Sequence, residues 1–137
     1  MIQLSVFIEN EPGKLLKITQ TLGQAGIDIQ ALTIAETKQF GVVRMVVDDT
    51  EIATAVLTQN GLVCHLTEVT AIEIEDRPGE LAKILEILGA NKINVEYMYG
   101  FFDPSRQKAI MIMRFKEDAS ALSVLMQNNI NIFAPHL

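Results

Sequence analysis

The sequence has few of the residues that form disulfides, metal centres or cofactor sites. Cys64 is its only cysteine, and His65 and His136 are its only histidines. No disulfide can therefore form within the chain, and neither a metal site nor a bound cofactor is predicted. A single cysteine is typical of a reducing compartment, so we expect a cytoplasmic protein. No glycine-rich loop of the nucleotide-binding kinds is present either.

Long apolar runs and basic clusters are also missing. No apolar stretch approaches the ~20 residues of a membrane helix, so we expect no membrane association. The first residues enter a strand pattern without the basic segment and apolar core of a signal peptide. The net charge is −6, and the 11 Lys and Arg residues are scattered. Nucleic acid is therefore not expected as a partner.

The main positive feature is an internal repeat. Asn10-Glu11-Pro12-Gly13 returns 66 residues later as Asp76-Arg77-Pro78-Gly79. The same shift relates Lys17 to Lys83, Ile18 to Ile84, Leu22 to Leu88, Gly23 to Gly89 and Ile27 to Ile93. Two copies of one small domain, residues 1–67 and 68–137, are therefore predicted to fill the chain. No segment is left for a catalytic module, so we predict that the protein is not an enzyme.

Each copy shows the periodicities of six elements. In the first copy we predict strands at 2–8, 27–35, 42–47 and 62–66, a helix at 12–25 and a short helix from about residue 52. Pro12 suits the first turn of the longer helix, and Gly26 suits the left-handed position after its end. Asp48-Asp49-Thr50-Glu51 has the composition of a cap for the short helix.

The second copy repeats this order. We predict strands at 71–75, 94–102, 109–115 and 130–133, and helices at 78–89 and 119–127. Val56–Asn60 returns as Val124–Asn128 with a shift of 68, which places two extra residues in the hairpin loop at Pro104–Gln107. Lys92 stands where the first copy has Gly26, and Asn91 is a candidate for the left-handed position instead. The order βαββαβ predicts an α+β fold of two ferredoxin-like units, each an antiparallel sheet with both helices on one face.

One strand of the second copy is apolar on both sides. Tyr97, Tyr99 and Phe101 alternate with Met98, Gly100 and Phe102. A sheet covered by helices on one face normally presents polar residues on the other. A generous core would explain the pattern, but we favour burial of the open face in a homodimer.

The repeated Pro-Gly loop is a candidate ligand site. It leads into a helix whose unpaired N–H groups and positive dipole end favour a carboxylate. The turn after that helix is expected at the same edge, which would pair Asn10 with Asp28 and Asp76 with Asn94. An amide and a carboxylate beside a helix start suit the two charges of a free amino acid. These residue types are also common caps and turns, so a purely architectural role stays open.

This arrangement resembles the ACT domain, over essentially the whole chain and as two tandem copies. ACT domains are regulatory modules that bind amino acids and control enzymes of amino-acid metabolism. By analogy with serine-sensing members, the resemblance implies ligand contacts at both loops and both turns: Asn10, Glu11, Pro12, Gly13, Asp28, Ile29, Asp76, Arg77, Pro78, Gly79, Asn94 and Val95. It implies a free amino acid as effector, bound where the loop of one copy faces another copy or subunit, and a separate metabolic enzyme as partner.

The chain departs from the family pattern at three of these positions. Asp28 and Asp76 stand in place of Asn, and Glu11 in place of the Arg that is retained as Arg77. A structural or partner-binding module without a ligand, such as an acetolactate synthase-type regulatory subunit, is the alternative. An acylphosphatase-like enzyme would need an arginine in the first loop. Metal carriers of this topology need a second cysteine, and RNA readers need exposed aromatics in basic surroundings.

Overall fold

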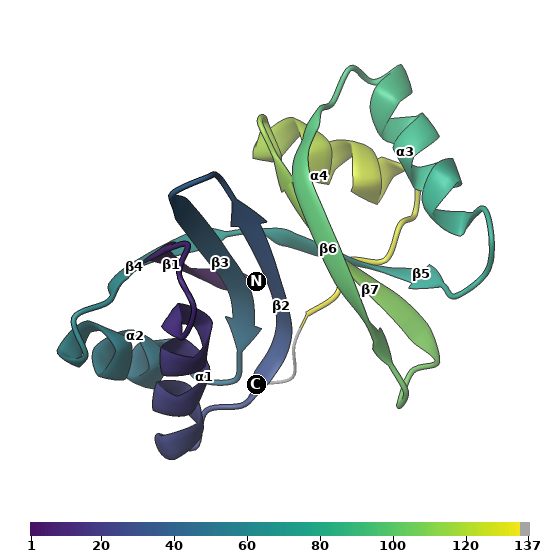
Figure 1. The fold of residues 1–137 in the computed structure, drawn as a ribbon. Helices are drawn as coiled ribbons and strands as arrows, with labels where there is room; N and C mark the ends of the chain where they lie inside the picture. Colours follow the sequence, from purple (N-terminus) through teal and green to yellow (C-terminus); the bar gives the residue numbers. More distant parts are fainter. Residues whose placement is uncertain (135–137) are drawn as a thin grey trace. The chain divides into compact units, whose positions relative to one another are not determined.

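A computed structural model describes residues 1–134 of the chain (Figure 1). The chain forms two compact units, one from Ile2 to Glu68 and the other from Val69 on, with Met1 added to the latter. Each unit is an antiparallel sheet with two helices packed on one face, so the α+β, ferredoxin-like prediction is confirmed. Within the described residues, no helix has the length and apolar character needed to cross a membrane.

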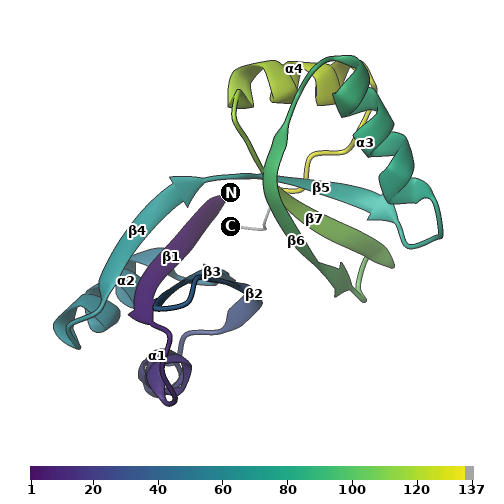
Figure 2. The ribbon, with the colours of Figure 1, turned by 45° about the horizontal axis from the view of Figure 1, so that its top comes forward.

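The first unit contains four strands and two helices (Figure 2). In chain order they are β1 (Ile2–Glu9), α1 (Lys14–Gln24), β2 (Ile29–Glu36), β3 (Phe40–Val47), α2 (Thr50–Gln59) and β4 (Val63–Glu68). The strands lie side by side in the order β2-β3-β1-β4. Alternate residues of β1 and β3, such as Leu4 and Met45, face the helices and pack against Leu22 and Leu57 with no exposed surface. The period of two in β1 thus puts one face of the strand in the core.

The second unit repeats the architecture with one strand fewer. Its elements are β5 (Thr70–Glu75), α3 (Glu80–Ala90), β6 (Val95–Asp103), β7 (Lys108–Phe115) and α4 (Asp118–Gln127), with the sheet order β5-β7-β6. Ile72, Phe115 and Leu125 are fully buried in its core.

The strand predicted at 130–133 is wrong, because only one bridge forms there, between Ile72 and Ile132. The repeat shifts relate this bridge to the Val6–Cys64 pair of the first sheet. The segment therefore keeps the register of a fourth strand without its length. Backbone bonds flank the bridge on both sides, from Glu73 N–H to the Asn131 carbonyl at 2.9 Å and from Phe133 N–H to the Ala71 carbonyl at 2.8 Å.

All four helices end in the same way, with one left-handed residue followed by a bond back to the last turn. The left-handed residues are Gly26, Gly61, Lys92 and Asn129, with φ of 74°, 78°, 58° and 57°. In α1, Ile27 N–H donates to the Leu22 carbonyl at 3.0 Å, and in α3, Ile93 N–H donates to Leu88 at 2.9 Å. This is the Schellman pattern.

The second of these endings corrects a prediction made from the sequence. Lys92 itself takes the left-handed position after α3, and Asn91 has φ of −96°. The Asn91 side-chain amide instead donates to the Ile87 carbonyl at 2.8 Å. A carbonyl near the helix end is thereby satisfied, which offsets the cost of a left-handed lysine.

Two helix starts also differ from the sequence prediction. The first helical residues are Lys14 in α1 and Glu80 in α3, so Pro12 and Pro78 lie in the turns before the helices and not in their first turns. At α2 the cap is Asp49, whose carboxylate accepts from Ile52 N–H at 3.0 Å, and Asp48 has a different partner. Of the two extra residues of the second copy, one widens the hairpin loop and the other lengthens β6.

Part of the open face of the second sheet is covered from within the chain. The Phe133 ring meets Phe101 of β6 edge-on, with ring centroids 6.3 Å apart. The Arg106 guanidinium lies 4.8 Å from the centre of the same Phe133 ring and also pairs with Glu73. The homodimer inferred from the apolar β6 strand therefore stays a prediction, because Phe133 accounts for some of that apolar surface.

Candidate functional site

The two Pro-Gly loops have the same backbone conformation. Gly13 and Gly79 have φ of 87° and 89°, in the left-handed region that glycine adopts without strain. In the first loop, Lys14 N–H donates to the Glu11 carbonyl, and in the second, Glu80 N–H donates to Arg77, both at 3.3 Å. No side chain caps either helix. The positive ends of α1 and α3 thus lie at two corresponding corners, which we call the first corner (residues 10–14) and the second corner (residues 76–80).

Asn10 fastens the first corner to the neighbouring β2–β3 hairpin. Its side-chain amide donates to the Glu36 carboxylate at 3.3 Å and to the Thr37 carbonyl at 3.4 Å, and its backbone N–H donates to Gln39 at 2.9 Å. Asp76 occupies the same place in the second corner but has no amide to donate. The Asn10 carbonyl oxygen, an acceptor, is the part of the side chain that these bonds leave for a ligand.

The turn residues Asp28 and Asn94 are held by the residues that directly follow β3 and β7. Asp28 N–H donates to the Asp48 carboxylate at 3.0 Å, and Asp48 N–H donates back to the Asp28 carbonyl at 3.2 Å. In the second unit Lys116 takes the place of Asp48, and its N–H reaches the Asn94 carbonyl at 3.5 Å. Asp28 and Asn94 are both exposed, with their backbones fixed at the start of β2 and β6.

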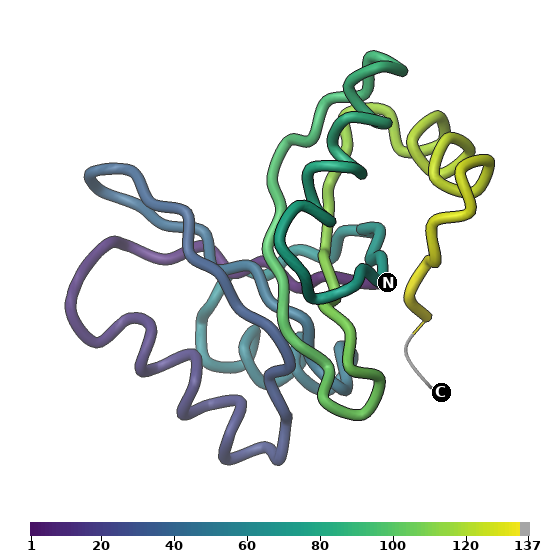
Figure 3. Tube along the Cα trace, turned by 90° about the vertical axis from the view of Figure 1, so that its right-hand side faces the viewer, coloured from purple at the N-terminus to yellow at the C-terminus, as the bar shows by residue number. Residues whose placement is uncertain are grey.

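The loop and the turn of one unit lie at opposite ends of its sheet, which contradicts the expectation that they share an edge. Glu9, next to Asn10, pairs with Phe40 at the start of β3, whereas Ile29, next to Asp28, pairs with Val47 at its end. Seven residues of strand separate them, or about 23 Å. Figure 3 follows α1 from the loop to the turn at its far end. The chain direction explains this separation. The helix runs antiparallel to the strand before it, so the turn after the helix lies at the opposite end of the sheet from the loop before it. Asn10 therefore cannot share a ligand with Asp28 of its own unit, nor Asp76 with Asn94.

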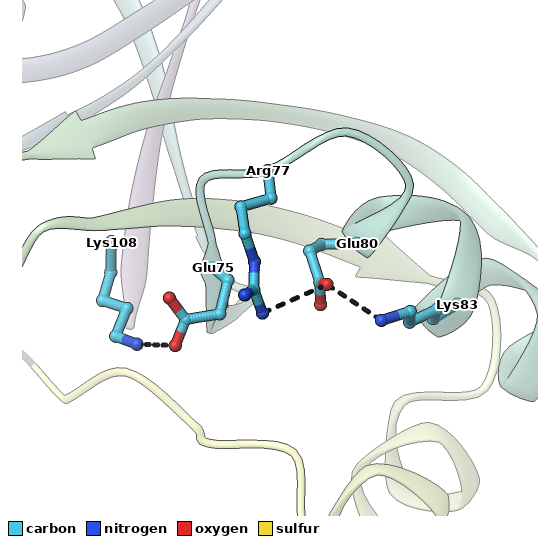
Figure 4. Close-up of polar contacts among 5 residues, drawn as sticks. All are labelled: Glu75, Arg77, Glu80, Lys83 and Lys108. Carbon is cyan, nitrogen blue, oxygen red and sulfur yellow. Dashed lines mark hydrogen bonds and ion pairs between the residues drawn. The ribbon is translucent and has the colours of Figure 1, made fainter.

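A row of charged side chains lies beside the second corner (Figure 4). The Glu80 carboxylate accepts from Lys83 at 2.9 Å and from Arg77 at 3.5 Å. Glu75 pairs with Lys108 on the adjacent strand, and Arg77 lies between Glu75 and Glu80. The hydrogen bond from Lys83 lowers the pKa of Glu80, and the bond from Lys108 lowers the pKa of Glu75. Both carboxyl groups therefore stay ionised to a lower pH than an isolated glutamate.

A shallow hollow lies near each corner. The one in the first unit has a volume of about 250 Å³ and is mainly apolar, with Phe7, Phe40 and Val42 in its lining. The one in the second unit, about 280 Å³, is lined by the charged residues Glu75, Glu80 and Lys83 among others. None of the twelve predicted ligand residues lines either of these two hollows. The predicted residues instead form exposed rims, since all but Ile29 and Val95 are exposed.

The comparison with known families decides what these paired units are. A family model described as an ACT domain pair matches residues 1–136. The chain belongs to this family. The resemblance noted from the Pro-Gly loops is therefore confirmed, and the two corners are the equivalent loops of two ACT domains.

Solved structures similar to the ACT pair cover nearly its whole length. Protein BT0572 from Bacteroides thetaiotaomicron is 34% identical, with 97% of this chain and 91% of that chain aligned and a TM-score of 0.90. The ligand-free regulatory subunit of aspartate kinase from Thermus thermophilus is 18% identical over 92% and 91%, with a TM-score of 0.61. That from Thermus flavus is 16% identical over 92% and 90%, with a TM-score of 0.57. The two kinase subunits show a shared fold alone. No curated protein matches the sequence significantly.

Sequence reasoning missed several residues of the ACT pair that shape the corners. Glu80 could have been found, because it lies three residues from both Arg77 and Lys83, a spacing that brings opposite charges together on a helix. Lys108 and Asp48 could not have been found in this way. Their partners Glu75 and Asp28 are far away in sequence and meet them through strand pairing.

Proposed function

We propose that the ACT pair is a non-catalytic sensor that binds a free amino acid at a Pro-Gly corner and controls a separate enzyme of amino-acid metabolism. Each unit is one functional domain, residues 1–67 and 68–137. The observation that carries the proposal is the shared backbone conformation of the two corners, which places the positive ends of α1 and α3 behind a left-handed glycine. Such a corner accepts a carboxylate through backbone N–H groups.

In this proposal the other half of the site belongs to another unit, because the loop and the turn of one unit lie at opposite ends of its sheet. We infer a homodimer in which the turn of one chain, at Asp28 or Asn94, faces a corner of its partner. The Asp28 carboxylate or the Asn94 amide oxygen then accepts from the effector's ammonium group, while the helix end binds the effector's carboxylate. Binding would tighten the dimer, and this coupling can be passed to a partner enzyme.

Two observations favour the alternative, a structural or partner-binding module without a ligand. The Asn10 amide is already bonded to Glu36 and Thr37, and the second corner is filled with ion pairs. An acetolactate synthase-type regulatory subunit that works through protein contacts alone would fit them. The first corner still has an uncapped helix end, which is why we prefer the sensor.

A thermal-shift screen of the full chain against the twenty amino acids, followed by calorimetry, tests the proposal. A ligand that binds only the folded state raises the midpoint of thermal unfolding. At a ligand concentration of 100 times its Kd, the free energy of unfolding increases by about 2.7 kcal/mol. We expect one or a few amino acids to do so. Light scattering should give twice the mass of the 15.2 kDa chain. Silence towards all twenty, with a cooperative unfolding transition, would leave only the structural role.

A further inference from the structure

The faces of the two sheets that are turned away from the helices carry corresponding rows of three residues, one residue from each of three paired strands. Strand pairing defines the second row as Glu73, Ile110 and Phe101. It defines the first row as Phe7, Val42 and Ala35. The repeat shift of 66 residues relates Phe7 to Glu73 and Ala35 to Phe101, so the two rows occupy the same place in their units.

The second row is covered by an aromatic ring from its own unit. The Phe133 ring meets Phe101 edge-on, and Arg106, which lies on the same ring, pairs with Glu73. The Glu73 side chain is only 15% exposed, and Ile110 in the middle of the row has no exposed surface. The ring is thus tied to both ends of the row.

The first row has no such cover. The repeat shift of 68 residues places His65 where the second unit has Phe133, and His65 is exposed and does not line the hollow of the first unit. Ala35 replaces the ring of Phe101. All three residues of the first row line the hollow of about 250 Å³. The hollow therefore lies where the second unit has two aromatic rings.

Exposed apolar side chains extend the hollow into a continuous surface. Phe7 is 49% exposed, and Phe40, which also lines the hollow, is 60% exposed. Val63 of β4 pairs with Phe7 and is 66% exposed. Single exposed apolar residues need no explanation, but a contiguous group around a hollow is typical of a binding surface.

The lining indicates which kind of occupant fits. Among the described residues that line the hollow, Glu9 is the only charged one. The carboxylate of a free amino acid would find no cation in this lining and would be repelled by the Glu9 carboxylate. An aromatic residue within a peptide chain carries no backbone charge, so it can bury its ring without leaving a charge unpaired.

We propose that the hollow of the first unit is a docking site for an aromatic side chain of a partner protein, which covers the first row as Phe133 covers the second. Aromatic side chains that fill a pocket are common anchors of protein interfaces. The inference gives the separate partner of the ACT pair a place to bind. It does not require that the ACT pair senses an amino acid, because none of the predicted ligand residues lines the hollow.

N-acetyl-L-phenylalaninamide is the probe, because it presents the aromatic ring without the charges of a free amino acid. Gly41 lines the hollow, so its backbone N–H signal in the ¹⁵N-labelled full chain reports binding there. We expect this signal to move on titration with the probe and to move less with free phenylalanine at the same concentrations. It should stay with N-acetyl-L-alaninamide, which lacks the ring.

Three variants test the assignment. Ala35→Phe gives the first row the residue of the second and should stop the movement of Gly41, because the new ring fills the hollow. Ala55→Phe adds the same ring at an exposed site on α2 and should leave the response unchanged. Phe133→Ala uncovers the second row, so the signal of Ala109, the counterpart of Gly41, should move with the probe in this variant alone. The spectrum itself shows whether each variant is folded.

Several results would overturn the proposal. A Gly41 signal that stays at the highest soluble concentration of the probe would leave the hollow without an aromatic occupant. Free phenylalanine that binds as tightly as the probe would assign the hollow to a free amino acid. Movement of Gly41 on dilution of the chain alone would assign it to a second copy.

The variants can contradict the proposal as well. Movement of Gly41 that persists in Ala35→Phe would place the probe outside the hollow. An Ala109 signal that stays in Phe133→Ala would remove the equivalence of the two rows. The sensor proposal is decided separately, by whether the Gly13 signal at the first corner moves with any of the twenty amino acids.

Discussion

Asp28 and Asp48 exchange two hydrogen bonds, with the Asp28 N–H donating to the Asp48 carboxylate at 3.0 Å and the Asp48 N–H returning a bond of 3.2 Å. The pair joins the turn after α1 to the end of β3. The first unit thus fixes the backbone of a predicted ligand residue with a side chain that the second unit lacks. In the second unit Lys116 offers only its backbone N–H.

Removing the Asp48 carboxylate should loosen the turn at Asp28. We expect Asp48→Ala to lower the free energy of unfolding by about 1 kcal/mol, because Asp28 N–H loses its acceptor at an exposed site. Asp48→Asn keeps an acceptor and should cost less. Lys116→Ala, at the equivalent position, removes no such bond and should change stability by under about 0.5 kcal/mol. Urea unfolding measures all three; equal losses in Asp48→Ala and Lys116→Ala would contradict the assigned role.

The cap of α2 gives a second matched pair. Asp49 caps α2 through the Ile52 N–H, whereas Glu117, its counterpart before α4, makes no side-chain cap bond. Asp49→Ala should therefore destabilise the protein by about 1 kcal/mol, and Asp49→Ser should recover most of the loss. Glu117→Ala should be close to neutral. Thermal unfolding of the three variants is the measurement, and a larger effect at Glu117 would count against the cap.

Replacing glycine by alanine should destabilise the protein where φ is left-handed and stabilise it where φ is helical. Gly13 has φ of 87°, and an added methyl group would meet open space, so Gly13→Ala should cost about 1 kcal/mol from backbone strain alone. Gly23 is helical and equally open, and Gly23→Ala should stabilise by about 0.5 kcal/mol. Denaturant unfolding of the two variants gives both signs, and a loss of stability in Gly23→Ala would contradict the open surroundings of that helix position.

Lys92 provides the opposite test, because here a non-glycine residue occupies a left-handed position. Its φ of 58° is costly for a lysine, so Lys92→Gly should raise the free energy of unfolding by up to about 1 kcal/mol. Asn91→Gly should lower it, because Asn91 has φ of −96° and loses its bond to Ile87. Denaturant midpoints compare the two; a gain in Asn91→Gly would mean that the helix ends differently in solution.

The second corner should contribute a pH-dependent part of the stability. The bond from Lys83 lowers the pKa of Glu80 from its usual 4.5, so the unfolded state binds more protons than the folded state between the two pKa values. The contribution is complete above pH 4.5 and is lost as the pH falls through the lowered pKa. Glu80→Gln should thus be less stable than the unaltered chain at pH 7, with a gap that closes below pH 4.5.

Two further observations check this assignment. Glu86→Gln on the exposed side of the same helix leaves the bond between Glu80 and Lys83 in place, so it should not reproduce the loss of stability of Glu80→Gln at pH 7. High salt should narrow the gap at pH 7, because exposed charges are screened. Unfolding curves between pH 3 and pH 7 supply both. A gap that widened towards low pH would have the wrong sign for a lowered pKa.

A site shared between two chains predicts complementation. Asp28→Ala and Asn94→Ala, tested separately, should show which turn completes the site, with a loss of about tenfold or more in affinity where an ionic hydrogen bond disappears. The weakened variant, mixed with an Asn10→Ala chain and refolded, should regain binding in the mixed dimers. Neither parent should bind at the same concentration. Unchanged affinity in both turn variants would discard these residues as ligands.

Much of the fold could be read from the sequence because it depends on near neighbours. The periodicities of β1 and α1, the left-handed Gly26 and the repeated Pro-Gly loops involve residues a few positions apart, where propensity and hydrogen bonding act directly. The constant shift between the copies then gave two ACT units. The last strand was overestimated, because a bridge of one residue pair and a short strand have the same apolar pattern.

The sequence by itself determined two copies of one domain and the loops in which a ligand could meet a helix end. Only the tertiary structure decided which residues share those loops. Asn10 meets Glu36, Glu75 meets Lys108 and Asp28 meets Asp48 through strand register, and α1 carries the turn at Asp28 to the far end of the sheet. Strand register and chain direction are set by the packing of a whole sheet. The local sequence around any one of these residues therefore does not predict its partner.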